Sequence, residues 1–249
     1  MMETRITSRK NPLIQQVRKL LTSKKERENT GLFVADGTKL LAEAVAHDSG
    51  LHTVILTENV QISLPPQVQV VRVADEIMEY ISPMEAPQGA IFLCRIPEQR
   101  DWTAKAGMLL LDGIQDPGNL GTILRTADAL DIPVVLMEGC ADPYNHKTVR
   151  ASMGAVFRVQ PIQATWEQVR EKCADAGIPV AVTALSPRAK DIRQSELSSM
   201  AVVIGSEGQG VRQQILEQAD GELIIPMNPH CESLNAAIAA TIVIWQMNN

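Results

Sequence analysis

The sequence predicts an α/β protein whose C-terminal part contains a mostly parallel sheet with helices on both faces. From residue 108 onward, short strand patterns alternate with helical patterns, as they do in open α/β sheets. These strand segments are almost entirely apolar, which is typical of parallel strands that are buried on both faces. A shorter alternation of strands and helices over residues 31–96 predicts a separate, small α/β domain in front of it.

The N-terminal segment predicts an amphipathic helix over residues 12–30. Its apolar positions recur at helical spacing, and Asn11 and Pro12 are suitable N-cap and first helical residues. The first 35 residues carry eight basic and three acidic side chains, although the whole chain has a net charge of -6. This concentration of positive charge indicates a contact with a polyanion, and a solvated helix face remains the alternative. The basic residues are Arg5, Arg9, Lys10, Arg18, Lys19, Lys24, Lys25 and Arg27.

Three domain segments follow from these patterns. Residues 1–96 are expected to form the basic helix and the small α/β domain, with strands over 31–37, 52–57, 68–73 and 89–96. Residues 97–107 are polar and show little periodicity, so they predict a linker. Residues 108–249 are expected to form the second domain.

The second domain is expected to contain six strands and five helices. The strand patterns cover residues 108–111, 132–137, 157–160, 178–184, 201–205 and 222–226. The helical patterns cover 119–130, part of 147–155, 166–176, 210–218 and 234–247. The last helix is apolar almost all round, so we expect it in the core or at a subunit interface.

Composition excludes several classes of protein. No apolar window reaches the length of a membrane span, and the N-terminal residues lack the apolar region of a secretory signal. The four cysteines show no CxxC spacing, so we expect reduced thiols in the cytoplasm and no metal site. Aromatic residues make up only 3% of the chain, so a nucleic-acid contact would depend on charge and hydrogen bonds more than on base stacking.

Three loops rich in turn residues follow three of the predicted strands. They are "DGIQDPGNLGT" after residue 111, "GSEGQGV" after residue 204 and "PMNPHCESLN" after residue 225. Because ligands bind beyond the carboxyl ends of parallel strands, these loops predict one shared pocket. The glycine pattern fits neither the dinucleotide-binding motif nor the phosphate-binding loop, so the usual nucleotide sites are disfavoured.

The same loops carry a family resemblance. The segments "NLGTILRTADA", "VVIGSEGQGV" and "IPMNPHCESLNAAIAA" resemble the three motifs of the SpoU family of RNA methyltransferases, in the family's order. The segment "HKTVRASMGAVFRV" between the first two motifs is also similar to the family. The first domain resembles the small α/β substrate-binding domain of many members, mainly through "GLFVADGTKLLAEA".

The resemblance implies an enzyme that transfers a methyl group from S-adenosylmethionine to a ribose 2′-hydroxyl of structured RNA. It also implies a deep trefoil knot of the SPOUT superfamily in the second domain and a homodimer formed through that domain. Ribosomal RNA is favoured over transfer RNA because a separate domain offers surface for recognition by shape. A transfer RNA 2′-O-methyltransferase, a base methyltransferase and a non-catalytic RNA-binding or ribosome-assembly protein remain alternatives.

The resemblance also implies the residues of the site. The catalytic set is Arg125, Asn119, Glu207, Ser233 and Asn235. The residues expected to bind the cofactor are Thr183, Ala184, Leu185, Gly205, Gly208, Ile225, Met227 and Leu234. The residues expected to bind RNA are Arg9, Lys10, Arg18, Lys19, Lys147 and Arg150.

Arg125 is the central catalytic candidate, and two roles are open. It could accept the proton of the 2′-hydroxyl, or it could grip an RNA phosphate and stabilise the developing alkoxide. An arginine guanidinium group holds its proton tightly near neutral pH, which favours the second role. Asn119 is expected to cap the helix that carries Arg125, and Asp112 and Asp116 are expected to anchor the loop.

The residues before the last helix are expected to begin that helix and to line the site. Ser233 and Asn235 could serve as caps or contact the substrate directly, and both roles are open. Cys231 follows His230, but 2′-O transfer needs no covalent intermediate, so a nucleophilic cysteine is disfavoured.

Overall fold

The computed structural model describes residues 4–47, 49–99, 101–228 and 230–248, and the chain forms two compact units. The first unit combines Met1–Glu98 with Tyr144–Arg158, and the second combines Gln99–Pro143 with Val159–Asn249. The prediction assigned all residues from 108 onward to the second domain. In the structure, the segment Tyr144–Arg158 packs with the N-terminal unit instead.

The first unit is built on a mixed five-stranded sheet in the order β1-β4-β3-β5-β2. Strand β5 is antiparallel to β2 and β3, whereas β3–β4 and β1–β4 are parallel pairs. Its strands are β1 (Thr4–Ile6), β2 (Leu32–Asp36), β3 (Leu51–Thr57), β4 (Gln69–Val73) and β5 (Ala90–Arg95). Its helices are α1 (Pro12–Thr22), α2 (Lys24–Thr30), α3 (Thr38–Ala46), α4 (Asp75–Ile81) and α6 (His146–Ala151).

Two apolar layers hold this sheet between helices. On one face, α1 and α4 pack against strand residues that include Val34, Ile55 and Val71. On the other face, α3 packs against Phe33, and the segment that contains α6 completes the layer. That segment contributes the buried side chains Tyr144, Val149 and Val156, which explains why it belongs to the first unit.

The second unit is built on a seven-stranded sheet in the order β10-β12-β9-β11-β6-β7-β8, and every strand pair in it is parallel. Its strands are β6 (Leu109–Leu111), β7 (Val134–Leu136), β8 (Ile162–Gln163), β9 (Val180–Thr183), β10 (Lys190–Asp191), β11 (Ala201–Ile204) and β12 (Gly221–Ile224). Its α-helices are α5 (Pro117–Ala129), α7 (Trp166–Asp175), α8 (Gln213–Gln218) and α9 (Ala236–Met247).

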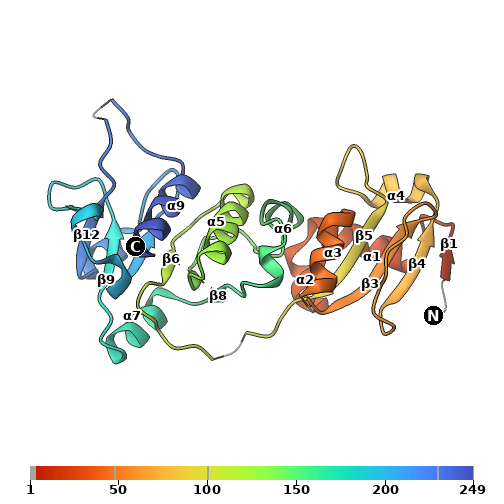
Figure 1. Ribbon diagram of the computed structural model, residues 1–249, viewed down its shortest axis with the longest axis horizontal. Coiled ribbons are helices and arrows are strands. Elements are labelled where there is room, and N and C mark those ends of the chain that lie inside the picture. The colour runs from red at the N-terminus through yellow and green to blue at the C-terminus, as the bar shows by residue number, and fades with distance from the viewer. Residues whose placement is uncertain (1–3, 48, 100, 229, 249) are drawn as a thin grey trace. The chain divides into compact units, whose positions relative to one another are not determined.

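The predicted parallel sheet with helices on both faces is confirmed. Strand residues alternate between the two faces, so that Leu109 and Leu111 pack with α5 and α9, whereas Leu110 packs with α7 and α8. Helices α5 and α9 lie side by side on their face (Figure 1). The trefoil knot implied by the family resemblance stays a prediction.

Three local predictions are wrong for identifiable reasons. The single helix over residues 12–30 is two helices, because Ser23 ends α1 and its side chain caps α2. Residues 157–160 form no strand, because Gly154 adopts a left-handed conformation with φ +94° and leads into a 3₁₀ turn (Ala155–Phe157). The helix expected from residue 119 begins two residues earlier, at Pro117.

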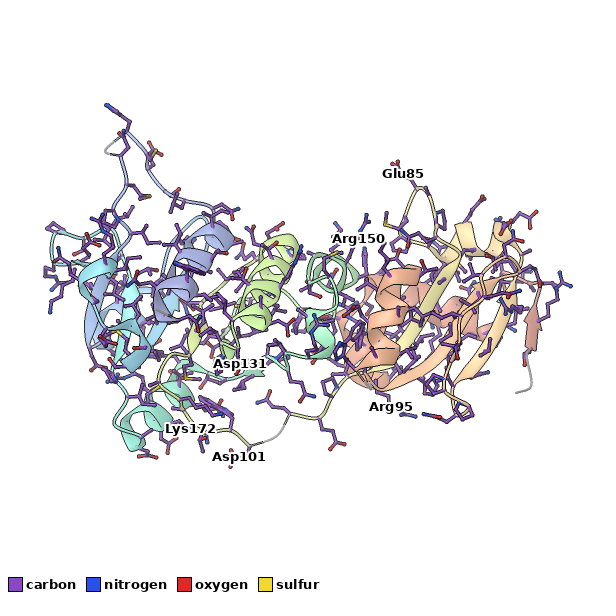
Figure 2. All side chains as sticks on the ribbon, in the orientation of Figure 1. Glu85, Arg95, Asp101, Asp131, Arg150 and Lys172 are labelled. Atoms are coloured by element: carbon purple, nitrogen blue, oxygen red, sulfur yellow. The ribbon has the colours of Figure 1, made fainter. Side chains whose placement is uncertain are left out.

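The polar segment expected as a linker makes specific contacts within the second unit. The Lys172 ammonium group lies 3.2 Å from the Asp101 carboxylate and 5.3 Å from the centre of the Trp102 ring, and Figure 2 shows Lys172 beside Asp101. Gln99 exchanges two hydrogen bonds with the backbone of Gln163. These contacts hold Gln99 against β8 and hold Asp101 and Trp102 against α7.

Within the described part of the chain, no helix has both the length and the apolar character that a membrane crossing requires.

Candidate active site

The loops that follow β6, β11 and β12 leave the carboxyl end of the parallel sheet. The loop after β6 leads into α5, the loop after β11 leads toward α8, and the loop after β12 leads into α9. These are the three segments that resemble the family motifs, so the topology places all three at one edge of the sheet.

A chain of hydrogen bonds joins one side chain from each of the three motif segments. The Asn119 amide nitrogen donates to Oε1 of Glu207 at 2.8 Å, and its oxygen accepts from Nδ2 of Asn235 at 3.0 Å. The backbone N–H of Gln115 lies 3.5 Å from Oε2 of Glu207. Three of the five predicted catalytic residues therefore form one polar cluster.

Asn235 also begins the last helix, as predicted. Its Oδ1 atom accepts hydrogen bonds from the backbone N–H groups of Ala237 at 2.9 Å and Ile238 at 3.3 Å. The same side chain thus caps α9 and orients Asn119, because its oxygen faces the helix while its nitrogen faces the cluster.

Asn119 does not cap α5, so the prediction of its capping role is wrong. The cap is Asp116, whose Oδ1 accepts a hydrogen bond from the backbone N–H of Asn119 at 2.8 Å. Pro117 then occupies the first turn, where a missing N–H costs nothing. Because Asp116 supplies the cap, the Asn119 side chain is available to form hydrogen bonds with Glu207 and Asn235.

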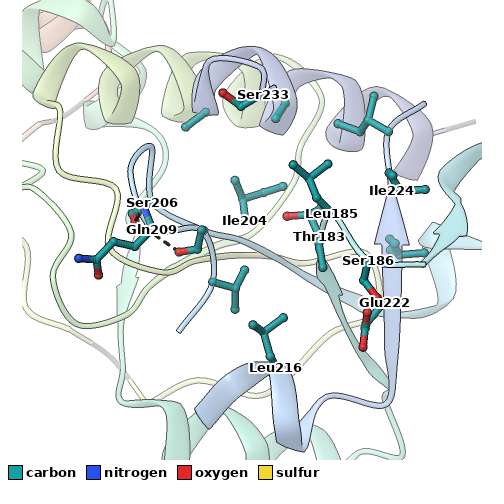
Figure 3. A pocket seen from close by; sticks show the side chains of 18 of the residues that line it. Thr183, Leu185, Ser186, Ile204, Ser206, Gln209, Leu216, Glu222, Ile224 and Ser233 are labelled. Carbon is teal, nitrogen blue, oxygen red and sulfur yellow. Dashed lines mark hydrogen bonds between the residues drawn. The ribbon is translucent and has the colours of Figure 1, made fainter. Parts of the chain in front are cut away.

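A cavity of about 750 Å³ opens beside this cluster. Figure 3 shows Leu185, Ile204 and Leu216 around the open space, with Ser233 on the side opposite Leu216. All eight residues predicted to bind the cofactor line this cavity, and so do Glu207 and Ser233.

The walls of the cavity combine apolar side chains with carboxylates. Leu185, Ile204 and Ile224 supply apolar surface, whereas Glu217 and Glu232 add negative charge. The Glu222 carboxylate is paired with the Arg188 guanidinium group at 2.7 Å. This lining suits an organic ligand that has an apolar portion and a positive charge.

The two glycines that were predicted to bind the cofactor differ in their steric role. A Cβ atom at Gly205 would overlap the backbone of Gly210 and Val211, because the loop closes on itself through two hydrogen bonds between Ser206 and Gly210, each 3.0 Å long. A Cβ atom at Gly208 would meet nothing within 4 Å. Gly205 is therefore required by the fold of the loop, whereas Gly208 leaves open space beside the cavity.

An ion pair between a partly exposed arginine and a buried carboxylate fastens this loop to the loop that follows β6. Asp112 is 1% exposed, and its carboxylate accepts from Nε of Arg212 at 2.6 Å and from the backbone N–H of Arg212 at 2.8 Å. Arg212 also contacts Glu138 at 2.8 Å. Burial lowers the pKa of Arg212, but the two carboxylates outweigh this and raise it above the usual value.

Sequence reasoning anticipated Asp112 as a loop anchor but missed Arg212. The available sequence signal for Arg212 was its position, as a single basic residue between the glycine-rich loop and α8. Nothing in the spacing of two residues 100 positions apart indicates that they touch.

Arg125 stands apart from the polar cluster. It lies on α5 six residues beyond Asn119, is exposed, and does not line the cavity. Within the described part of the chain its guanidinium group has no hydrogen bond or ion pair. An exposed, unneutralised arginine is available to an anionic substrate.

The six residues predicted to bind RNA all lie in the first unit. Each is exposed, and Arg150 projects from α6, as Figure 2 shows. The Arg150 side chain contacts the sulfur atom of Met84 and lies near the Asp36 carboxylate, whose pKa is raised by burial despite that positive charge.

The cysteines form no site among the described residues. Burial raises the pKa of Cys94 to about 12 and that of Cys140 to about 11, so neither is a ready nucleophile. Cys231 is exposed in the loop before α9.

The fold and the cavity define an α/β enzyme domain with a small-molecule site at the carboxyl ends of parallel strands. Residues 107–245 match the SpoU rRNA Methylase family, and residues 11–91 match the MRM3-like substrate binding domain. The chain belongs to the SpoU rRNA Methylase family.

Known proteins resemble the chain over nearly its whole length. The 23S rRNA (guanosine(2553)-2′-O)-methyltransferase RlmP of Bacillus subtilis is 35% identical over 97% of this chain and 98% of its own. An AdoMet-bound rRNA methyltransferase from Sinorhizobium meliloti has a TM-score of 0.86 and 30% identity, and the match covers 98% of this chain and 97% of that one. A protein of the TrmH family from Porphyromonas gingivalis has a TM-score of 0.83 and 31% identity, and the match covers 94% of this chain and 95% of that one.

Proposed function

We propose that this protein transfers a methyl group from S-adenosylmethionine to a ribose 2′-hydroxyl of ribosomal RNA. The observation that carries the proposal is the convergence of Asn119, Glu207 and Asn235 beside the cavity, since these residues come from the three family segments. The activity named for the Bacillus subtilis relative, which aligns with almost the whole chain, supports the same reaction.

The cavity fits S-adenosylmethionine in size and in chemistry. Its volume of about 750 Å³ falls within the range of small-molecule sites. Apolar side chains such as Leu185 and Ile225 can cover the adenine ring, and the carboxylates of the cavity suit a ligand that carries positive charge. When bound, the cofactor supplies an activated methyl group.

The residues around the cavity then have to position the acceptor and manage its proton. In the transfer the 2′-oxygen would bond to the methyl carbon while the bond from that carbon to the cofactor sulfur breaks and leaves a neutral thioether. The hydroxyl proton would pass to solvent water, and negative charge develops on the 2′-oxygen as that proton leaves. Glu207 accepts a hydrogen bond from Asn119, which orients its carboxylate at the side of the cavity next to the cluster. Arg125 stabilises the developing charge and an RNA phosphate, because its guanidinium group is unneutralised and exposed.

Methylation assays with purified RNA test the proposed reaction. The full chain is incubated with radiolabelled S-adenosylmethionine and unmodified 23S ribosomal RNA, and transfer RNA serves as the competing substrate. We expect label in ribosomal RNA at a position that becomes resistant to alkaline cleavage, because a 2′-O-methyl group removes the attacking hydroxyl. Label confined to transfer RNA would reassign the substrate, and label at an alkali-sensitive position would identify a base methyltransferase.

A homodimer formed through the second unit is part of the proposal. Ile238 is 51% exposed and Trp245 is 59% exposed on α9, and Ile242 between them is half-buried on the same helix. Their spacing of four and three residues places them on one helical face. An exposed apolar face of this kind suits the isologous contact of two copies.

Light scattering of the purified protein tests the dimer. Trp245→Glu places a charge on the exposed face of α9 and is expected to shift the protein from dimer to monomer. Glu171→Lys, at an exposed position of α7, is the matched control and should leave the mass unchanged. A monomeric wild-type protein at micromolar concentration would contradict this part of the proposal.

A ribosomal RNA substrate also implies a cytoplasmic location.

A further inference from the structure

Two arginines of the first unit surround one tyrosine. The guanidinium carbons of Arg18 and Arg9 lie 4.3 Å and 4.9 Å from the centre of the Tyr80 ring. Arg18 belongs to α1, Arg9 precedes it, and Tyr80 belongs to α4, so the cluster is assembled from two elements of the same unit.

The cluster is held in place by further hydrogen bonds. The Gln15 amide nitrogen donates to the backbone carbonyl of Arg9 at 2.6 Å, and Arg9 reaches the backbone carbonyl of Glu76 at 3.5 Å. Hydrogen bonds with Gln15 and then with Arg18 lower the pKa of the Tyr80 hydroxyl. These contacts restrain two long side chains that would otherwise sample many rotamers in water.

The two guanidinium groups are not neutralised within the described part of the chain. Glu76 and Glu79 lie on α4 beside Tyr80, but no ion pair joins either carboxylate to Arg9 or Arg18. Other exposed arginines of the same unit are paired, for example Arg5 with Glu58 at 3.3 Å. Two like charges held on one aromatic ring repel each other, and a bound anion relieves that repulsion.

We propose that Arg9 and Arg18, organised by Tyr80, form a binding site for backbone phosphates of the RNA substrate. This inference rests on the proposed function, because it names the contact through which the first unit holds RNA. Arginine forks match phosphate oxygens in geometry, and Lys10 and Lys19 add positive charge on neighbouring exposed positions. The contact reads no base, so it fixes where the RNA lies and leaves sequence recognition to other residues.

Tyr80 is the new element of this site. Charge counting identified both arginines as candidates but gave no reason to include an uncharged residue 62 positions beyond Arg18. The ring contributes by holding the guanidinium groups in a binding geometry before RNA arrives, which reduces the entropy lost on binding.

Binding of the full-length protein to a fluorescent oligouridine, measured over a series of salt concentrations, tests the site. Arg9→Gln combined with Arg18→Gln should weaken binding about 10-fold and lower the salt slope by about 1.4, since each lost phosphate contact on a single strand removes about 0.7. Tyr80→Leu should weaken binding about 2- to 5-fold while the salt slope is kept, because both charges remain. In the double arginine variant, Tyr80→Leu should add almost nothing.

Matched variants separate this site from general electrostatics. Arg5→Gln removes an equal charge from the same unit but one that Glu58 neutralises, and it should change affinity less than about 2-fold. Tyr80→Phe keeps the ring and should retain most of the affinity, and a loss as large as that of the double arginine variant would contradict the role given to the ring. Equal losses in Arg5→Gln and Arg18→Gln would overturn the phosphate site. If the wild-type protein binds neither oligouridine nor ribosomal RNA, the proposed function itself fails.

Discussion

The two units place their functional residues in different ways. In the second unit, parallel strands deliver three loops to one edge, so Asn119 and Asn235 meet although they lie 116 positions apart. In the first unit the candidate RNA contacts lie on α1 and α6 or just before α1, and they share positive charge rather than one edge of a sheet. A parallel sheet therefore concentrates polar side chains into a site, whereas the mixed sheet supports a surface.

Replacement of Arg125 should give the largest effect if the second unit carries the chemistry. Arg125→Ala is expected to lower the methyl-transfer rate about 100- to 1,000-fold, the loss typical of removing one charge-stabilising group. Affinity for S-adenosylmethionine should stay unchanged, because Arg125 does not line the cavity. Single-turnover kinetics and calorimetry measure the two quantities separately.

Arg125→Lys sharpens the same test. Lysine keeps the charge but loses the planar fork, so most of the rate should be lost at every pH. If lysine retained most of the rate across a pH series, the guanidinium geometry would be irrelevant and the proposed role wrong.

Gly205→Ala should have the next largest effect. Its methyl group would overlap the backbone of Gly210 and Val211, so the loop after β11 must open at a cost of about 1–3 kcal/mol. The expected result is a weaker affinity for S-adenosylmethionine together with a lower melting temperature. Gly221→Ala is the matched control, because a Cβ atom there meets nothing within 4 Å and Gly221 lies outside the cavity. An unchanged cofactor affinity in Gly205→Ala would show that the loop tolerates the overlap.

The ion pair behind that loop should contribute a smaller amount. Arg212→Gln removes the hydrogen bond from Nε to the buried Asp112 carboxylate but keeps the backbone hydrogen bond, so we expect a loss of about 1.5 kcal/mol in the free energy of unfolding. Arg193→Gln, which breaks the exposed pair with Asp191, should cost less than about 1 kcal/mol. Equal losses in the two variants, measured by urea denaturation, would mean that burial of Asp112 adds nothing.

The difference between local and long-range contacts explains which parts of the fold and site the sequence predicts. The second unit was predictable in outline, because apolar strands alternate with helices and its three loops carry motifs at the strand ends. The residue that caps α5 was predicted wrongly, because local hydrogen bonding determines it. Asp116 rather than Asn119 caps α5. Its carboxylate lies three residues before the backbone N–H of Asn119, which is the spacing of an N-cap hydrogen bond.

Long-range packing was harder to predict. The segment Tyr144–Arg158 lies between two family motifs, yet Val149 and Val156 are buried in the first unit. Apolar residues in a short helix do not indicate which sheet they will cover. The Arg212–Asp112 pair and the Tyr80 cluster were missed for the same reason, since each depends on contacts between elements distant in the sequence.

The smallest expected effect is a difference between the two units in how their stability depends on pH. Burial lowers the pKa of His146 and of His52, to which Arg95 adds a smaller effect, and both histidines lie in the first unit. A histidine with a lowered pKa in the folded state destabilises the fold as the pH falls through its unfolded value, about 6.5, because the unfolded chain then binds more protons.

Hydrogen exchange between about pH 7.5 and 5.5 measures this difference, after correction for the intrinsic pH dependence of exchange. Protection of β3 amides in the first unit should fall by less than about threefold, and protection of β11 amides in the second unit should stay constant. His52→Gln combined with His146→Gln should abolish the fall, whereas His230→Gln in the second unit should leave it unchanged. Burial raises the pKa of the Asp36 carboxyl above its usual value, and this acts on stability in the opposite direction with pH. An equal loss of protection in β3 and β11 would show that the two units respond to acid as one cooperative body.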